Sequence, residues 1–526
     1  MNPDYSIICK SRLATLNTQG YKSLLDHFAY ASREFADRTA FATGEDSITF
    51  AEINQRSRNL ASYLSNHLKL APGSRVAIQM PNHYHYAIAT WAVLRAGMVI
   101  VNTNPLYTAR ELKHQFNDSG AVALIVADSL AESTSKVIEE TGIKHVIIDR
   151  PCGTNITLQD AEKMGSDYRF EDFIANMDTL AALQYTGGTT GLSKGAMLTH
   201  GNFFAAMTIT REVFPVQDEE QEVVIAPMPV YHIYGFLMSM ISTFLNGGMS
   251  ALIPNPRNID SVLAEMLRYS GSGLAGVNTL FQGMMAHPDF DKVDFSRYVS
   301  VIAGGTALIK EISDEWRSKT GIDIQEGYGL SETASALTVN APGARKLGSV
   351  GKILRTLDVA LLDADGNEVE KGQPGEISVR GPIVMQGYWN KADATLEAIT
   401  PDGFFRTGDI GTVDDEGFIT IVDRVKDMII VSGFNVYPNE VESVVYGHPS
   451  VVECAAVGVK SDTTGEAIKL YVVSKDPTLT ADDLIAFCRQ ELTGYKVPKD
   501  IEFRSDLPKS NVGKILRRSL RDEANA

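Results

Sequence analysis

The chain has 526 residues, of which 44% are hydrophobic and 21% charged, and its formal net charge at pH 7 is −17. A chain of this length is too long for one compact core, so we expect two or more domains. The net negative charge argues against nucleic acid as a partner, because nucleic-acid binding needs a basic surface. It does not exclude polyphosphate substrates, which backbone N–H groups and a few cations can bind.

The cysteines are scattered along the chain, with neither a C-x-x-C pair nor a partnering histidine cluster. We therefore expect reduced thiols in a cytoplasmic protein, without a disulfide framework or a zinc site. The first residues lack the basic and apolar regions of a signal peptide. The most apolar stretches, Ala87–Val101 and Gly235–Leu245, are too short to span a membrane, so we expect a soluble protein.

The first half of the chain alternates helical and strand patterns. Apolar residues at helical spacing predict helices over Tyr21–Ala36, Phe50–Leu70 and His83–Gly97. Short apolar runs predict strands over Ser74–Met80, Met98–Asn102, Ala121–Val126 and His145–Asp149. Strands that alternate with helices indicate an α/β fold, in which helices cover both faces of parallel sheets.

From about Asp358 the pattern changes to β-rich hairpins. Val359–Asp363 and Glu376–Arg380 are predicted to pair around the turn Asp365-Gly366-Asn367. Beyond Asp423 the sequence predicts a small α+β unit, with helices over Ser443–Tyr446 and Ala481–Leu492, the second capped by Thr480, and strands over Val452–Val459 and Ile468–Val473. We therefore expect an N-terminal domain over residues 1–425, β-rich at about 350–425, and a C-terminal domain over residues 426–526.

The segment Tyr185–Gly195 (YTGGTTGLSKG) concentrates glycines and hydroxyl side chains. Glycine lets the backbone approach an anion closely, hydroxyls donate hydrogen bonds to phosphate oxygens, and Lys194 adds a positive charge. The common P-loop needs glycine immediately before its lysine, and Ser193 stands there instead. Alone, the segment is compatible with a phosphate-binding loop or with a flexible surface loop.

Two other motif matches stand in the wrong context. Gly191–Gly195 fits the G-x-S-x-G pattern of α/β-hydrolases, but small residues rather than a strand precede Ser193. Gly271–Gly276 fits G-x-G-x-x-G, yet a helical pattern over Ser261–Ser270 precedes it and a strand-like segment follows, which reverses the order of a dinucleotide-binding site. We therefore expect neither a serine nucleophile nor a nicotinamide cofactor.

Five motifs follow one another at wide spacing: YTGGTTGLSKG (185–195), EGYGLSET (326–333), FRTGD (405–409), DRVKD (423–427) and PKSNVGK (508–514). Together they resemble the adenylate-forming (ANL) superfamily of acyl-CoA synthetases, peptide-synthetase adenylation domains and beetle luciferases. The resemblance covers essentially the whole chain. Over Asp402–Lys426, Gly276–Phe281 and Val431–Pro438 the chain looks most like bacterial long-chain fatty acid–CoA ligases.

The resemblance implies the ANL fold, a large N-terminal α/β domain with a β-rich subdomain and a small, mobile α+β C-terminal domain. It also implies a site for ATP and its Mg²⁺. Glu332 matches the carboxylate that binds Mg²⁺, with Thr186 as the second metal ligand, and oxygen ligands suit this cation. The triphosphate loop is matched by Thr186, Gly187, Gly188, Thr189, Thr190 and Lys194. The adenine and the α-phosphate are expected at Gly304, Gly305, Thr306, Glu326, Gly327, Tyr328, Gly329 and Ser331, and the ribose at Asp409 and Arg424.

The remaining roles concern the acid, coenzyme A and domain movement. Lys514 matches the lysine that bridges the acid's carboxylate and the α-phosphate, where a cation offsets the charge of both reacting oxygens. His232 matches a histidine near that carboxylate, so the expected catalytic residues are Lys514, His232, Thr186 and Glu332. Lys426 matches the inter-domain hinge. Coenzyme A is expected at Ser432, Gly433 and Phe434, and the acyl chain at Tyr234, Phe236, Val277, Phe281 and Ala334.

The implied activity is an ATP-dependent fatty acid–CoA ligase, which forms acyl-AMP and pyrophosphate and then transfers the acyl group to coenzyme A. An aryl-CoA ligase of the coumarate type shares every core motif and stays open. A fatty acyl-AMP ligase that loads a carrier protein also stays open, although the insertion typical of that branch does not follow Lys426. Intact Lys194, Glu332, Asp409 and Lys514 disfavour a catalytically inactive binding module. The sequence leaves a homodimer open.

One segment departs from the long-chain pattern. Ile148–Ala175 is short and mixed in charge, and its middle, Cys152–Asp172, shows no clear hydrophobic face. Relatives in the long-chain branch tend to carry a longer, basic stretch there. We therefore expect at most peripheral contact with a membrane, and a medium-chain acyl substrate stays open.

Overall fold

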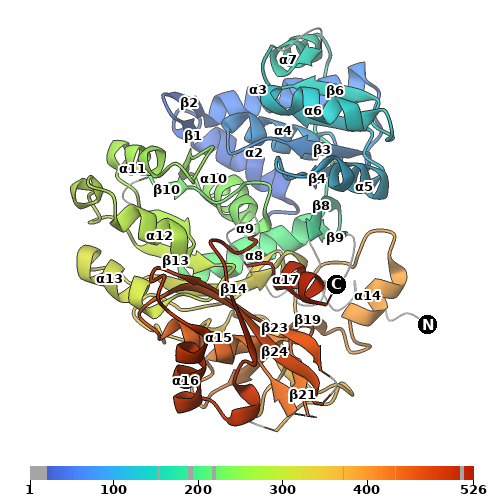
Figure 1. Ribbon diagram of the computed structural model, residues 1–526. Coiled ribbons are helices and arrows are strands. Elements are labelled where there is room, and N and C mark those ends of the chain that lie inside the picture. The colour runs from blue at the N-terminus through green and yellow to red at the C-terminus, as the bar shows by residue number, and fades with distance from the viewer. Residues whose placement is uncertain are drawn as a thin grey trace. The chain divides into compact units, whose positions relative to one another are not determined.

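The structure, a computed structural model, describes residues 20–151, 155–186, 193–215, 221–370, 372–432, 434–461, 463–509 and 515–525. The chain divides into two compact units (Figure 1). The first comprises Met1–Asp358 and Arg380–Phe405, and the second comprises Val359–Val379 and Arg406–Ala526. The second unit thus joins most of the predicted β-rich subdomain to the C-terminal residues.

A seven-stranded sheet in the first unit has the order β7-β6-β5-β3-β4-β8-β9. Its strands run parallel except for the antiparallel pair β8 and β9. Apolar side chains of the helices α5 and α6 pack on one face, and α4, which is buried all round, contacts β3 and β4. The bounds are β3 Arg75–Gln79, α4 Tyr84–Arg95, β4 Val99–Asn102, α5 Ala109–Ser119, β5 Ala123–Val126, α6 Asp128–Ile138, β6 His145–Ile148, β7 Ile156–Thr157, β8 Leu180–Thr186 and β9 Lys194–Thr199.

A nine-stranded sheet in the same unit has the order β16-β15-β14-β13-β12-β10-β11-β1-β2, parallel in the middle and antiparallel at both edges. Its strands are β1 Thr39–Thr43, β2 Asp46–Thr49, β10 Val223–Ala226, β11 Met249–Leu252, β12 Gly273–Gly276, β13 Ser300–Gly304, β14 Gln325–Leu330, β15 Ser335–Val339 and β16 Lys352–Ile353. The accompanying helices are α2 Leu24–Glu34, α3 Phe50–Ser62, α8 His200–Val213, α11 Ile259–Arg268, α12 Asn278–Met285 and α13 Lys310–Thr320.

The structure confirms the predicted helices and strands of the first half. Thr49 and Glu52 form a capping box that begins α3, and a π-helical turn, Tyr63–His67, extends it toward the predicted end. The G-x-G-x-x-G match begins after the helix α11 and runs into the strand β12, as expected from the sequence. A dinucleotide-binding site needs the opposite order, with the motif after a strand and at the start of a helix.

The second unit contains a four-stranded sheet, β17-β18-β19-β20, and a five-stranded sheet, β22-β21-β24-β23 with β25 beside β24. The strands are β17 Asp358–Leu362, β18 Gly375–Arg380, β19 Phe405–Val413, β20 Ile419–Arg424, β21 Ile429–Val431, β22 Phe434–Val436, β23 Val451–Ser461, β24 Gly465–Ser474 and β25 Asp500–Phe503. The helices are α15 Pro438–Tyr446, α16 Ala481–Glu491 and α17 Arg517–Ala524, and Thr480 caps α16 as predicted.

The predicted pairing of β17 with β18 is confirmed, because the two strands are neighbours in the sheet. The turn itself differs from the prediction: the N–H of Asp363 donates to Asn367 and that of Val369 donates to Leu361, so the turn leads into residues 367–369 before the chain reaches β18. One helix also needs correction. The helix predicted over Ser443–Tyr446 begins earlier, at Pro438. Proline is favoured in the first turn of a helix because its missing N–H needs no partner there.

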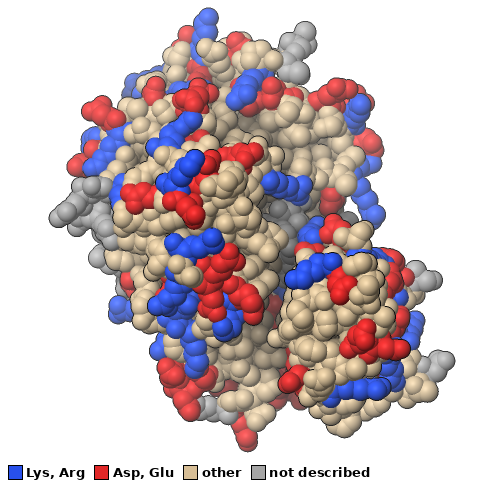
Figure 2. Space-filling view, turned by 60° about the vertical axis from the view of Figure 1, so that its left-hand side comes forward, with Lys and Arg blue, Asp and Glu red and all other residues tan. Residues whose placement is uncertain are grey.

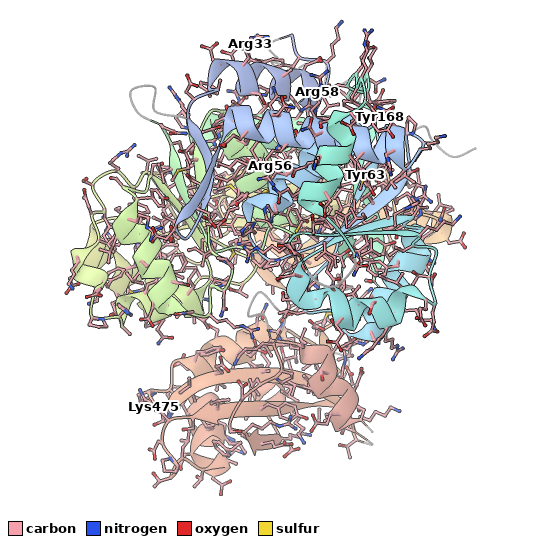
Figure 3. All side chains as sticks on the ribbon, turned by 90° about the horizontal axis from the view of Figure 1, so that it is seen from above. Arg33, Arg56, Arg58, Tyr63, Tyr168 and Lys475 are labelled. Carbon is pink, nitrogen blue, oxygen red and sulfur yellow. The ribbon has the colours of Figure 1, made fainter. Side chains whose placement is uncertain are left out.

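The segment without a clear hydrophobic face contains a packed helix, α7, over Leu158–Ser166. A side chain at Gly165 would place a Cβ 1.9 Å from the carbonyl oxygen of Asn59, so the glycine lets α7 approach α3 closely. Arg56 of α3 forms a bidentate ion pair with Glu162 of α7, at 2.9 and 3.0 Å. Figure 3 labels Arg56, Tyr63 and Tyr168 in this region. The interpretation that this segment has no clear hydrophobic face is therefore wrong for Leu158–Ser166, where Leu158, Ala161 and Gly165 are buried on one side of the helix.

The surface is mixed in charge. Figure 2 shows basic and acidic side chains interspersed over the face in view. Among the described helices, none has an apolar run of the length that a bilayer crossing requires.

Candidate active site

The glycine-rich segment connects the two arms of a β-hairpin. The register of β8 and β9 pairs Thr186 with Lys194 and Tyr185 with Gly195. Paired residues on antiparallel strands project to the same face, so the Thr186 hydroxyl and the Lys194 ammonium leave the hairpin on one side. The predicted loop residues between them, Gly187, Gly188, Thr189 and Thr190, lie outside the described residues.

The hairpin gives no support to a serine nucleophile. His114 is the histidine that meets Ser193, and its Nε2 contacts the backbone carbonyl oxygen of that serine at 2.8 Å. An activated serine needs a base within hydrogen-bond reach of its hydroxyl oxygen. The contact to the carbonyl instead fixes the start of β9.

The side chain of Glu332 contacts those of Thr186 and Tyr388, and the Tyr388 ring in turn lies near the ammonium of Lys194. The Glu332 side chain is buried, and its Oε1 accepts a 2.8 Å hydrogen bond from the hydroxyl of Tyr388. The same oxygen lies 3.4 Å from Oγ1 of Thr186. The ammonium of Lys194 lies 4.9 Å from the centroid of the Tyr388 ring. The structure therefore brings Thr186, Lys194 and Glu332 to one place, around Tyr388.

Tyr388 belongs to none of the sequence motifs. It stands between β18 and the helix α14, Ala392–Ala398, outside all five motifs, and no pattern in the sequence connects it with Glu332. Burial raises the pKa of Tyr388, and the neighbouring Glu332 carboxylate raises it further. The phenol therefore stays protonated at neutral pH and can act as the donor in this hydrogen bond.

The turn after Glu332 has unusual backbone geometry. Ala334 and Ser335 both have positive φ angles, +50° and +111°, and both are buried. Thr333 stabilises this turn, because its Oγ1 accepts from the N–H of Leu330 at 3.0 Å. A Cβ at Gly329 would lie 1.7 Å from the carbonyl oxygen of Ser335, so β14 and β15 can approach closely only with glycine there. Strained backbone of this kind is frequent at functional sites.

The predicted adenine-binding residues lie at the ends of two adjacent parallel strands. The register of β13 and β14 pairs Gly304 with Gly327, and Gly305 follows at a φ of +85°. The side chain of Glu326 is buried, and its Oε1 accepts from the N–H of Leu308 at 3.0 Å. Glu326 thus fixes the loop that contains Thr306. The structure therefore brings these residues together at one edge of the nine-stranded sheet.

Glu326 makes the stability of the chain depend on pH. Burial raises its pKa from 4.5 to about 7, against the opposing effect of the Leu308 N–H. Between these values the folded chain retains a proton that the unfolded chain releases, so stability falls as the pH rises through this window. Glu326→Gln is expected to remove this fall, worth at most about 3 kcal/mol. The free energy of unfolding in urea, measured at pH 5 and pH 8, checks it. A variant that loses as much stability as the wild type between these pH values would contradict the assignment.

His232 begins a short helical turn, and its Nδ1 accepts from the N–H of Tyr234 at 3.3 Å. Burial lowers the pKa of His232 to about 4, so the imidazole is neutral at pH 7. Because Nδ1 is the acceptor, the proton lies on Nε2, which can donate to a carboxylate. The ring of Tyr234 lies over Gly304, where a Cβ would be 3.2 Å from Cε1 of the tyrosine. The predicted histidine therefore lies near the end of β13.

The five predicted acyl-pocket residues differ in exposure. Tyr234 and Val277 retain accessible surface, whereas the other three are enclosed. Phe281 packs against Trp316 with a centroid distance of 5.1 Å, and Phe236 packs against Phe203 at 5.4 Å. Ala334 is fully buried in the strained turn. Tyr234 and Val277 are thus the two of the five whose side chains are not enclosed in the core.

The two predicted ribose-binding residues meet in the second unit. β19 and β20 pair Asp409 with Arg424, and Nε of the arginine donates to Oδ1 of the buried carboxylate at 2.8 Å. Gly408, at a φ of +75°, donates its N–H to Glu376 at 3.0 Å, and the N–H of Asp409 donates to Thr407 at 3.1 Å. These bonds fix the position of the carboxylate.

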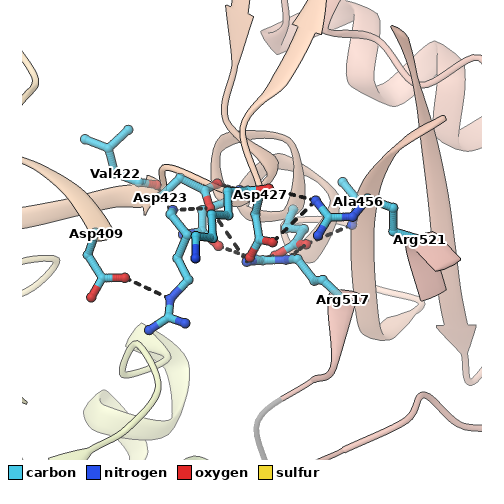
Figure 4. Close-up of polar contacts among 11 residues, drawn as sticks. Asp409, Val422, Asp423, Asp427, Ala456, Arg517 and Arg521 are labelled. Carbon is cyan, nitrogen blue, oxygen red and sulfur yellow. Dashed lines mark hydrogen bonds and ion pairs between the residues drawn. The ribbon is translucent and has the colours of Figure 1, made fainter. Parts of the chain in front are cut away.

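Asp423 and Asp427, which flank the predicted hinge Lys426 in the sequence, belong to a buried ionic cluster around Arg517 (Figure 4). Asp423, on β20, accepts from the backbone N–H of Asn439 at 2.7 Å and lies 3.7 Å from a guanidinium nitrogen of Arg517. The same nitrogen lies 3.7 Å from Asp427, and Arg521 donates to the carbonyl of Lys426 at 2.7 Å. Arg517 therefore links Asp423, before Lys426, to Asp427, after it.

This cluster has consequences for the predicted hinge. Burial raises the pKa of Asp423 to about 6, although Arg517 lowers it. Any rotation about Lys426 that separates β20 from the following residues must break the contacts of Asp423 with Asn439 and Arg517. Arg517 lies outside the five motifs, so no pattern in the sequence indicated this role.

The predicted coenzyme A segment is described on both sides of Gly433, which itself lies outside the described residues. Ser432 has a φ of +52°. Phe434 is exposed, and its ring stacks on that of Tyr495 at a centroid distance of 4.9 Å. Lys514 also lies outside the described residues.

The donors present fit one hard cation. Thr186 and Glu332 supply a hydroxyl and a carboxylate oxygen, the ligand type that Mg²⁺ prefers when substrate phosphates complete its coordination. Within the described part of the chain, no group of three or more His, Cys, Asp and Glu side chains forms a metal site.

Comparisons with known proteins identify the family and the fold. The family described as AMP-binding enzyme matches residues 28–389, and the AMP-binding enzyme C-terminal domain matches residues 440–514. A long-chain-fatty-acid–CoA ligase of Salmonella typhimurium is 45% identical over 97% of this chain and 96% of its own. A feruloyl-CoA synthase of an Amycolatopsis species is 35% identical over 92% of this chain and 95% of its own. The ATP-bound crystal structure of MatB from Rhodopseudomonas palustris is 31% identical, with a TM-score of 0.87 over 94% of this chain and 98% of that one. The predicted α/β ANL fold is thereby confirmed, and the chain belongs to the AMP-binding enzyme family.

Proposed function

We propose that the chain is an AMP-forming fatty acid–CoA ligase. The observation that carries this proposal is 45% identity, over nearly the full length of both chains, to a long-chain-fatty-acid–CoA ligase. The hairpin site adds chemical support, because Thr186, Lys194 and Glu332 offer a hydroxyl, a cation and a carboxylate suited to a metal–phosphate group. ATP and coenzyme A are its co-substrates and Mg²⁺ its cofactor. The free, buried Cys454 and Cys488 fit the reducing cytoplasm that we propose as its location.

In the first half-reaction a carboxylate oxygen of the fatty acid attacks the α-phosphorus of ATP, and the bond to the bridging oxygen breaks to release pyrophosphate. Lys194, Thr186 and the loop 187–190 bind the phosphates. Glu332 and Thr186 would bind Mg²⁺, which would supply positive charge to neutralise the phosphate oxygens. We assign Ser331 and Lys514 to the α-phosphate, with Lys514 also on the acid's carboxylate. The neutral His232 donates its Nε2–H to that carboxylate.

The remaining nucleotide contacts follow the same assignment. Tyr328 and the residues Gly304–Thr306 contact the adenine, with Glu326, Gly327 and Gly329 shaping the strand beside it. Asp409 and Arg424 contact the ribose, because one carboxylate can accept hydrogen bonds from both hydroxyls.

In the second half-reaction the thiol sulfur of coenzyme A attacks the acyl carbonyl carbon, and the bond to AMP breaks to give the thioester. We propose that movement about Lys426 separates the two half-reactions and that Ser432, Gly433 and Phe434 guide the thiol. The contacts of Asp423 with Asn439 and Arg517 oppose that movement, because the free energy of breaking them adds to the barrier.

Pyrophosphate release distinguishes this function from its alternatives. We expect release with a series of fatty acids from butyrate to stearate, accelerated over many turnovers by coenzyme A. Release driven only by aryl acids such as ferulate would overturn the proposal and favour the aryl-CoA ligase, an alternative that the Amycolatopsis relative keeps open. A single turnover without any response to coenzyme A would instead indicate a fatty acyl-AMP ligase.

Val277 is the position at which we expect chain-length preference to change. It follows β12, whose register with β13 pairs Gly276 with Ala303, so it lies beside Gly304. Val277→Trp is expected to lower kcat/KM for long fatty acids by about 10- to 100-fold while sparing short ones, because methylene groups lose room in the pocket. Measurements of kcat/KM along the fatty acid series check it.

The neighbouring positions are less suitable for this test. A Cβ at Gly276 would lie 2.8 Å from the Phe281 ring, and Ala334 lies in the strained turn, so bulky residues there disturb folding. Val452→Trp, at an exposed valine of β23, is the matched control and should leave the preference unchanged. The same chain-length profile in Val277→Trp and the wild type would refute the pocket assignment.

A further inference from the structure

Tyr388 contacts two side chains of the proposed ATP site. Its hydroxyl donates a 2.8 Å hydrogen bond to Oε1 of Glu332, the oxygen that also lies 3.4 Å from Oγ1 of Thr186. Its ring lies 4.9 Å from the ammonium of Lys194, within the range of a cation–π interaction. One aromatic side chain therefore meets both the proposed metal ligand and the proposed phosphate-binding cation.

The backbone on both sides of Tyr388 is fixed to the elements that carry these partners. Ala196 and Tyr388 form an antiparallel bridge, and the N–H of Trp389 donates to Gly195 at 2.8 Å, so the segment is bound to β9. The N–H of Met385 donates to the carbonyl of Glu332, also at 2.8 Å. These backbone bonds hold the tyrosine ring in a fixed position relative to Glu332 and β9, as a residue that supports a binding site requires.

The chemistry of the contact explains why a tyrosine is useful here. A hydrogen bond to a carboxylate is short and strong, and it selects one orientation of the carboxylate plane. Carboxylates that bind metals depend on such partners, whose removal typically weakens metal affinity about 10- to 100-fold. The aromatic face acts separately, by restricting where the flexible lysine places its ammonium.

We propose that Tyr388 is a positioning residue of the nucleotide–metal site, which orients Glu332 through its hydroxyl and Lys194 through its ring. The inference rests on the proposed function, because it needs Glu332 to bind Mg²⁺ and Lys194 to bind phosphate. It adds to the five motifs a residue that none of them contains.

Tyr388→Phe removes the hydroxyl and keeps the ring. We expect it to weaken the binding of ATP in the presence of Mg²⁺ about tenfold, measured by titration calorimetry on the full chain. The affinity for ATP in EDTA should stay as in the wild type. Tyr388→Leu, which also removes the ring, should weaken ATP binding in EDTA as well, by about two- to fivefold.

A double-mutant cycle separates positioning from a structural effect. In a Glu332→Gln background, Tyr388→Phe should cause no further change in the Mg²⁺ dependence of ATP binding, because the carboxylate that it orients is absent. Tyr471→Phe is the matched control, since that hydroxyl donates to the carbonyl of Leu520 in the second unit. It should leave ATP binding unchanged with and without Mg²⁺.

Two results would overturn the inference alone. One is a Tyr388→Phe variant whose ATP affinity responds to Mg²⁺ as the wild type's does. The other is an equal loss of affinity with and without Mg²⁺, which indicates a general structural role. A wild-type chain that binds ATP equally well in EDTA would instead overturn this inference together with the assignment of Glu332 to the metal.

Discussion

Glu332→Gln is expected to slow pyrophosphate release by about a hundredfold or more while leaving the chain folded. Glutamine keeps the size of the side chain and can still accept from the Tyr388 hydroxyl, but it lacks the charge that a hard cation requires. The loss therefore falls on charge neutralisation at the triphosphate, which typically contributes several kcal/mol to such reactions. Pyrophosphate release with a saturating fatty acid, measured over a range of Mg²⁺ concentrations, checks this expectation.

The matched control is Glu311→Gln, which neutralises an exposed carboxylate in the first turn of α13. It should release pyrophosphate at the wild-type rate. Thermal unfolding distinguishes the intended effect from misfolding, because Glu332 is buried and its carboxylate has partners. Wild-type turnover by Glu332→Gln at low Mg²⁺ would remove this residue from the metal site.

The motif residues of the first unit could be predicted from the sequence, but their contacts could not. Thr186 and Glu332 stand 146 positions apart, and only the folded hairpin and the turn after β14 bring their oxygens to 3.4 Å. Tyr388 and Arg517 illustrate the remaining gap. Each acts through a partner distant in the sequence, and neither lies in a pattern typical of its role.

The secondary structure was predictable where large apolar side chains mark a face. α4 is rich in apolar residues and α16 begins at a capping residue, so both were found. α7 was missed because its buried face consists largely of small residues, including Ala161 and Gly165. Small residues carry little hydrophobic signal, although they permit close helix packing, as the contact of Gly165 with α3 shows.

Lys514→Ala is expected to separate the two half-reactions. Formation of acyl-AMP, measured as pyrophosphate release, should fall by about a hundred- to a thousandfold, because a cation that stabilises both reacting oxygens is lost. Conversion of supplied acyl-AMP and coenzyme A to the thioester should continue at close to the wild-type rate, because that step breaks the bond to AMP and does not involve the triphosphate.

The basic residues that flank Lys514 in the sequence, Lys509, Arg517 and Arg518, have acidic partners of their own, so one of them can serve as a control variant. Lys509 pairs with Glu453 at 2.8 Å, Arg517 lies among buried carboxylates, and Arg518 pairs with Asp522 at 3.4 Å. Arg518→Ala therefore removes an exposed charge from the same basic tail, and an exposed pair contributes little to stability. If a general basic surface were responsible, Arg518→Ala and Lys514→Ala would slow acyl-AMP formation alike. If Lys514 acts on the reacting oxygens, only its removal slows the first half-reaction, and loss of both half-reactions in Lys514→Ala would contradict the assignment.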